Sequence, residues 1–104
     1  MTNQDRLLAV YEALFPSVAV KLDDAGGITT EDGSCYTMAS VYYLLEIAWR
    51  KGHINAWIIK HARCETGSVY TVSIESPATY ETGAFRNEVI LMALARALRE
   101  EESA

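Results

Sequence analysis

YETGAFRNEVILMALARALR, from Tyr80 to Arg99, is the stretch that decides the fold expected of this sequence. Its apolar residues recur every three or four positions, which places them on one side of an α-helix. We predict a helix from about Gly83 to Glu101. Three glutamates at its C-terminal end oppose the helix dipole, so the acidic tail at about 100–104 is expected to fray. The apolar stripe of this helix is predicted to consist of Phe85, Val89, Leu91, Met92, Ala95 and Leu98.

Two stretches before this helix predict a β-hairpin. Residues 54–61 and 69–75 are rich in β-branched and aromatic side chains, and a turn at 63–67 separates them. Both faces of the first stretch are apolar near its middle, so its centre is expected to be buried between two layers. We therefore predict that a central strand carries Trp57, Ile58 and Ile59, with Leu91 and Leu94 packing toward the sheet.

The N-terminal half predicts two further helices and short strands. A first helix is expected from about Asn3 to Phe15, because Pro16 stops it and Thr2 and Asp5 form a capping box. Alternating residues 18–22 predict a strand, and Ile28 and Thr29 a second one. A second helix is predicted from about Tyr36 to Lys51, with Gly52 at its C-terminal end.

These elements predict one α+β domain over residues 1–104. The element order is α-β-(β)-α-β-β-α, in which three helices pack on a small, mostly antiparallel sheet. A chain of 104 residues is too short to divide into two halves that each bury a core. Because the second helix and the Trp57 strand each look apolar on two sides, we expect helices on both faces of the sheet.

The composition indicates a packed globular protein rather than a nucleic-acid-binding one. Half of the residues are hydrophobic and 22% are charged, as in domains that fold around their own core. Nine basic residues against fourteen acidic ones give a net charge of −5. This charge repels a phosphate backbone, so no nucleic-acid partner is expected.

Membrane and secretion signals are not found in the sequence. No stretch reaches the ~18 consecutive apolar residues of a membrane helix, and residues 1–5 do not resemble a signal peptide. We therefore expect a cytoplasmic protein with no membrane partner. The two cysteines, Cys35 and Cys64, are expected to stay reduced.

A family resemblance covers about Ile28 to Leu98. The passage from Thr29 into the second helix, the hairpin with Trp57 and the alanine-rich end at 93–98 are similar to small tailed-phage proteins with an α-β-α sandwich domain. In that family a tyrosine-serine-threonine-aspartate type segment opens the central helix, and residues 28–32 are its counterpart. The resemblance implies a phage or prophage origin in a bacterial host cell, and it transfers no catalytic residue.

Metal and cofactor sites are not indicated. Zinc sites are usually built from close pairs of cysteine or histidine ligands. Of Cys35, His53, His61 and Cys64, only the last two lie close together in sequence. We expect no metal ion and no cofactor.

Cys35 is the one candidate for catalysis. It is expected in the first turn of the second helix, where the helix dipole lowers the pKa of a thiol. His53 would lie about 27 Å away at the other end of that helix, which leaves His61 as the histidine that could pair with it. The alternative function is therefore a small cysteine-dependent enzyme using Cys35. The favoured interpretation is an ordinary packing contact.

Protein–protein binding is the leading functional prediction. The second helix carries more aromatic and aliphatic surface than one sheet contact covers, and tyrosine and tryptophan are common at interface centres. We expect a noncatalytic phage accessory protein that binds a protein partner or itself, as a homodimer. The interface is expected to use an exposed subset of Tyr42, Tyr43, Leu44, Ile47, Ile90 and Leu94.

Overall fold

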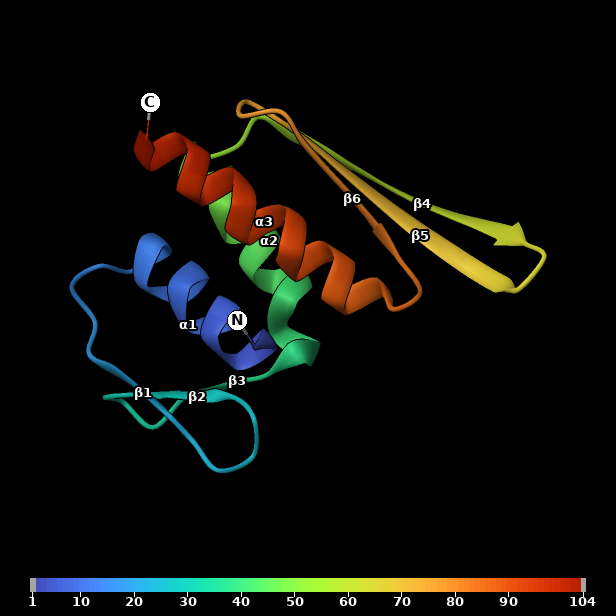
Figure 1. The fold of residues 1–104 in the computed structure, drawn as a ribbon. Helices are drawn as coiled ribbons and strands as arrows, with labels where there is room; N and C mark the ends of the chain where they lie inside the picture. Colours follow the sequence, from blue (N-terminus) through green and yellow to red (C-terminus); the bar gives the residue numbers. More distant parts are fainter. Residues whose placement is uncertain (1, 104) are drawn as a thin grey trace.

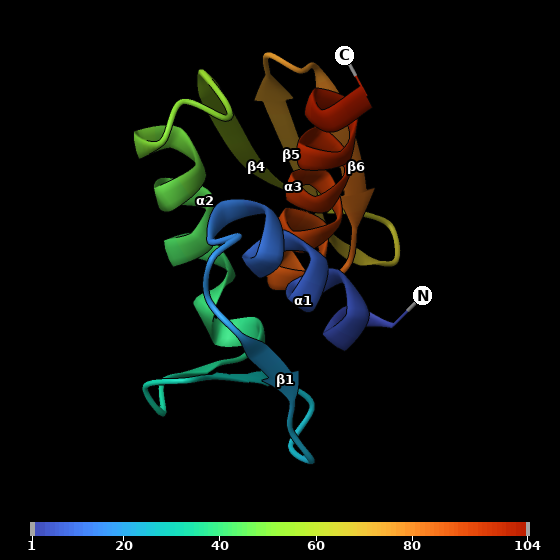
Figure 2. The same cartoon turned by 90° about the vertical axis from the view of Figure 1, so that its left-hand side faces the viewer.

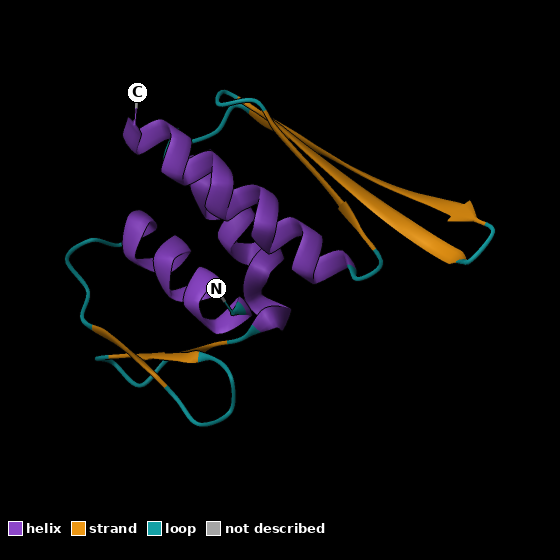
Figure 3. Cartoon of the chain, viewed as in Figure 1, coloured by secondary structure: helices purple, strands orange, loops and turns teal. Residues whose placement is uncertain are grey.

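The computed structural model describes residues 2–103 and shows an α+β fold. In this part of the chain, three α-helices lie between two small antiparallel sheets (Figures 1 and 3). The elements follow in the order α1 (Asn3–Leu14), β1 (Val20–Leu22), β2 (Ile28–Thr30), β3 (Cys35–Tyr36), the 3-10 helix η1 (Met38–Ser40), α2 (Val41–Arg50), β4 (Ala56–Cys64), β5 (Gly67–Glu75), β6 (Thr79–Gly83) and α3 (Arg86–Ser103).

Helix α1 forms as the sequence predicts. The Thr2 hydroxyl accepts a hydrogen bond from the backbone N–H of Asp5 at 3.1 Å, and the Asp5 carboxylate accepts one from the N–H of Thr2 at 3.1 Å. This reciprocal capping box satisfies amides that the first helical turn leaves unpaired. The helix then buries Leu7, Val10, Tyr11 and Leu14.

The first sheet has the strand order β1-β2-β3 and packs beside α1. Asp23 organises the turn between β1 and β2, because its carboxylate accepts hydrogen bonds from the N–H groups of Ala25 and Gly27, each at 2.9 Å. The Gln4 amide on α1 donates to the carbonyl oxygens of Asp23 and Gly27, each at 2.8 Å. These bonds fix the turn to the helical layer.

Helix α2 begins later than predicted. Cys35 and Tyr36 pair with β2 as the short strand β3 instead of opening the helix. Thr37 then caps η1, with its hydroxyl accepting from the N–H of Ala39 at 3.2 Å. The C-terminal end is as expected, because Gly52 follows Arg50 and Lys51 with a φ of +82° that glycine adopts without strain.

The second sheet differs from the prediction in its strand order. Residues 79–83 form a third strand, so the order is β4-β5-β6, and Gly83, the expected start of the last helix, belongs to this strand. The central strand is therefore β5, and the prediction of a central strand carrying Trp57, Ile58 and Ile59 is wrong. Ile58 is 55% exposed on β4, and Trp57 is half-buried.

Helix α3 packs against β5, β6, α1 and α2. Leu91 and Leu94 are fully buried, whereas Phe85, expected in the apolar stripe of the helix, precedes it and is 71% exposed. Residues 100–103 continue α3, and residue 104 lies outside the described residues; fraying of this end stays a prediction. Glu100 pairs with Arg96, and a carboxylate oxygen of Glu101 lies 2.5 Å from Nδ1 of His53.

The layering also differs from the one expected. The helices form a middle layer between two separate sheets rather than covering both faces of one sheet (Figure 1). The core lies within this layer and against the inner face of the second sheet, where Val72 and Ile74 are buried. The outer face of the second sheet has no element over it in the described chain.

Candidate functional site

Strand β4 forms one edge of the second sheet. It pairs with β5 along its whole length, from Ala56 opposite Glu75 to Cys64 opposite Gly67, and no described strand pairs with its other side. The turn end of this hairpin projects beyond α3 (Figure 1), and residues 60–68 are all exposed. An edge strand presents a row of backbone N–H and C=O groups that can pair with another chain.

The helical layer extends beyond this edge. Helix α3 packs against β5 and β6, whereas α2 lies on the β4 side (Figure 2). Tyr42 and Trp49 are seven residues apart, so they share one side of α2. The Trp57 ring on β4 meets both of them edge-on, with centroid distances of 6.2 Å to each. These three side chains form a row along the free edge, here called the aromatic row.

The aromatic row is held in place but only partly covered. The Trp49 indole N–H donates to the carbonyl oxygen of Asn55 at 3.1 Å, and the Arg86 guanidinium lies 5.5 Å from the centre of the Tyr42 ring. Tyr42 nevertheless remains 39% exposed and Trp49 51% exposed. Rigid aromatic side chains beside a cation are the residue types most often found at the centre of protein interfaces.

The outer face of the sheet adds exposed apolar surface on both of its edge strands. Ile58, Ser73 and Tyr80 occupy one row across β4, β5 and β6. Ile58 is 55% exposed and Tyr80 59% exposed. The β6 edge differs, because Arg96 donates to the carbonyl oxygen of Tyr80 at 3.5 Å and so covers part of that edge.

The predicted interface residues separate into two groups. Leu44, Ile90 and Leu94 are fully buried and Ile47 is 7% exposed, so these four belong to the monomer core and cannot form an interface. Tyr42 and Tyr43 are the exposed subset. The prediction does not include Trp49 and Ile58. The seven-residue spacing from Tyr42 indicates that Trp49 shares its side of α2, and the two apolar faces near Trp57 indicate an apolar surface at Ile58.

Tyr43 belongs to a second aromatic cluster on the other side of the helical layer. Its ring stacks on Tyr36 at 6.4 Å, and Tyr36 in turn contacts Tyr11 at 4.8 Å. Tyr11 also lies 4.7 Å from Phe15. Burial, together with the neighbouring Tyr36 hydroxyl, raises the pKa of Tyr11 to about 12. This cluster joins α1, β3 and α2.

The structure does not bring Cys35 and His61 together. Cys35 is exposed on β3, outside any helix N-terminus, and its sulfur lies 3.8 Å from the carbonyl oxygen of Gly33. His61 lies on β4, in the sheet on the other side of the helices (Figure 1), and stacks on Tyr70 at 4.0 Å. Hydrogen bonds from Thr66 lower the pKa of the Cys64 thiol at the hairpin turn.

The described residues contain no group of three histidine, cysteine or acidic side chains arranged to hold a metal ion. None of the described helices is long and apolar enough to cross a membrane.

Comparisons with known proteins give no match: no protein-family model, no curated protein and no solved structure is similar to this chain.

Proposed function

We propose that this chain is a noncatalytic phage or prophage accessory protein of the host cytoplasm, and that it acts by protein–protein binding. The β4 edge is the binding surface, and its occupant is a second copy of the chain. The phage assignment rests on the resemblance of residues 28–98 described above.

One observation carries the binding proposal: α2 lies beyond the edge strand β4 (Figure 2), and its residues Tyr42 and Trp49 are exposed there. A fourth strand added to β4 would lie over these rings. It would complete the backbone pairing of the edge and cover the aromatic row at the same time.

The sequence of β4 suits pairing with itself. In a two-fold antiparallel pair centred on Ile58, Lys60 faces Ala56, and in one centred on Ile59, Lys60 faces Ile58. Neither register places like charges opposite each other, and both place isoleucines at the centre. A pair centred on Lys60 would oppose two lysines. Joining two edges in this way forms a closed dimer with a six-stranded sheet.

The experiment compares two lysine substitutions on the outer face of the sheet. Ile58→Lys opposes like charges in both registers, because the new lysine faces either its own counterpart or Lys60 of the other copy. Thr82→Lys adds the same charge at an exposed position of β6, the other edge strand. Sedimentation should show that the wild type and Thr82→Lys dimerise at micromolar concentration, whereas Ile58→Lys stays an 11.5 kDa monomer with unchanged circular dichroism.

A wild-type protein that remains monomeric through a hundredfold concentration range would overturn the self-association proposal. Equal dimerisation of all three proteins would show that copies associate through another surface.

A further inference from the structure

A second surface, separate from the β4 edge, gathers positive charge in this acidic protein. A hollow of about 250 Å³ lies between α1, β6 and the C-terminal half of α3. It is lined by Arg6, Glu81, Met92, Ala95, Arg96 and Arg99. Three of the nine basic residues of the chain therefore meet at one hollow, against one acidic residue in its lining.

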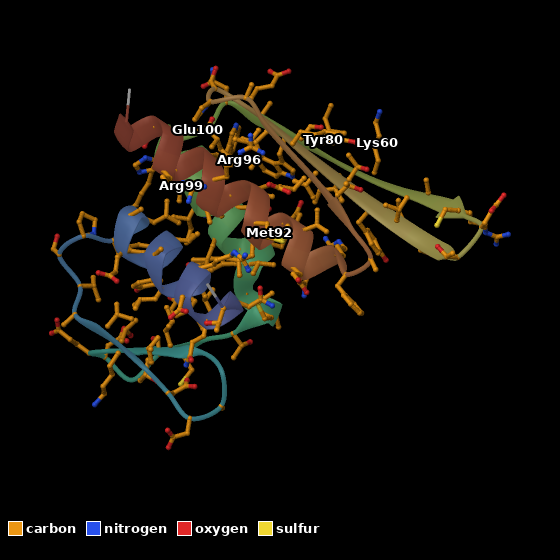
Figure 4. The ribbon with its side chains drawn as sticks, viewed as in Figure 1. Lys60, Tyr80, Met92, Arg96, Arg99 and Glu100 are labelled. Atoms are coloured by element: carbon orange, nitrogen blue, oxygen red, sulfur yellow. The ribbon has the colours of Figure 1, made fainter. Side chains whose placement is uncertain are left out.

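Helical spacing explains how α3 builds this wall. Met92, Arg96 and Arg99 are four and three residues apart, so they follow one another on the same side of the helix (Figure 4). Arg6 comes from α1, which packs against α3. Guanidinium groups thus approach the hollow from two different helices.

Arg96 and Arg6 each contact neighbouring polar side chains. Nη1 of Arg96 lies 3.4 Å from a carboxylate oxygen of Glu81, and its Nε lies 3.4 Å from one of Glu100. Arg6 is half-buried and donates to the Asn3 side-chain oxygen at 3.2 Å. Groups held in this way lose little conformational freedom when a ligand binds.

We infer that this hollow binds a small phosphate-bearing anion. A tetrahedral phosphate accepts hydrogen bonds in several directions, which suits guanidinium groups from two helices, whereas a planar carboxylate is matched by a single guanidinium fork. The net charge of −5 repels a long polyanion, so the ligand is a small molecule rather than a nucleic acid. Glu81 and Glu100, which both pair with Arg96, oppose the bound charge and limit the affinity.

The test is a titration with inorganic phosphate, followed by backbone amide NMR shifts, with sodium chloride at the same ionic strength as reference. The wild type should show saturable shifts at residue 6, at 81 and along 92–99, with a Kd of about 1 mM or tighter. Arg96→Gln and Arg99→Gln should each weaken binding by about tenfold, as expected for the loss of a charge-assisted hydrogen bond. Arg63→Gln, on the β4 hairpin, is the matched control and should leave the Kd unchanged.

Glu81→Gln provides a test in the opposite direction. It removes one opposing charge and one partner of Arg96 while keeping the side-chain shape, so it should tighten phosphate binding several-fold. Shifts that do not saturate, that occur equally in chloride, or that persist in both Arg96→Gln and Arg99→Gln would overturn the inference. A Glu81→Gln variant that binds phosphate more weakly would also contradict it.

Discussion

Tyr42 and Tyr43 are consecutive residues of α2, yet they belong to aromatic clusters on different sides of the helix. The Tyr42 ring meets Trp57 of β4 at 6.2 Å, whereas the Tyr43 ring stacks on Tyr36 of β3 at 6.4 Å. Neighbouring positions on a helix point about 100° apart, so one helix can serve both clusters. The first cluster borders the free β4 edge, and the second joins elements inside the monomer.

This division predicts different effects for substitutions in the two clusters. Tyr43→Ala should lower the free energy of unfolding by about 1 kcal/mol through the lost ring contact, without changing the dimerisation constant. Trp49→Ala should weaken dimerisation by tenfold or more, as an interface hot spot does. Chemical denaturation and sedimentation measure the two quantities separately. Weaker dimerisation in Tyr43→Ala with no effect in Trp49→Ala would contradict the assignment.

A second prediction concerns the position of Trp57. Trp57 is a half-buried residue of an edge strand, so Trp57→Ala should lower the free energy of unfolding by about 1–2 kcal/mol. Replacing a buried tryptophan by alanine typically lowers it by roughly 3–5 kcal/mol. Leu94→Ala, in the centre of α3, should cost about 2–5 kcal/mol because it leaves a cavity. Urea denaturation at a concentration that keeps the protein monomeric compares the two. A larger loss in Trp57→Ala than in Leu94→Ala would show that Trp57 contributes more to the core than its half-buried position indicates.

The raised pKa of Tyr11 predicts a loss of stability in alkali. The unfolded chain loses the Tyr11 proton near the ordinary pKa of 10, while the folded protein keeps it to about 12. Between these values the folded state binds more protons, so its stability falls as pH rises, and below pH 10 this contribution is fully present. Tyr11→Phe should reduce the decline in denaturation midpoint between about pH 10 and 12. An identical decline in both proteins would place the effect elsewhere.

Gly27 is predicted to tolerate no side chain. A Cβ there would overlap the carbonyl oxygen of Tyr36, in the turn that Gln4 fixes to α1. Gly27→Ala should therefore cost about 2–3 kcal/mol as an overpacked site. Gly26→Ala is the control, because Gly26 has a φ of +86° but open space around it, and should cost only about 1 kcal/mol. Thermal unfolding of the two variants should rank them in this order.

The sequence predicts the elements whose apolar pattern is long and regular. Helix α1, helix α3 and the β4–β5 hairpin are all found, because each repeats its pattern over two or more turns or alternations. Strand β6 lacks such a pattern. Its inward positions are Thr79, Glu81 and Gly83, where Thr79 bonds to the carbonyl oxygen of Ala93 and Gly83 leaves room for Val89. A strand whose inward residues are polar or small shows no alternating hydrophobic pattern, so the sequence does not predict it.

The candidate site is harder to predict for a related reason. Two apolar faces around Trp57 are typical of a central strand, but an edge strand beside a helix shows the same pattern. Which strand is central depends on β6, and the sequence pattern does not predict β6. For the same reason, the sequence marks Trp49 and Ile58 as apolar positions, but it does not tell that they are exposed while Leu44 and Ile90 are buried. Leu44 and Ile90 lie where α2 and α3 pack together, whereas Ile58 lies on the outer face of the second sheet.

Amide hydrogen exchange of β4 at two protein concentrations tests the central proposal most directly. If two copies pair through this edge, alternate amides between residues 57 and 63, those that β5 does not bond, should be protected at high concentration and exchange rapidly on dilution. Amides of β6 and of the first sheet should show no such dependence. Exchange in β4 that is the same at both concentrations would contradict the account.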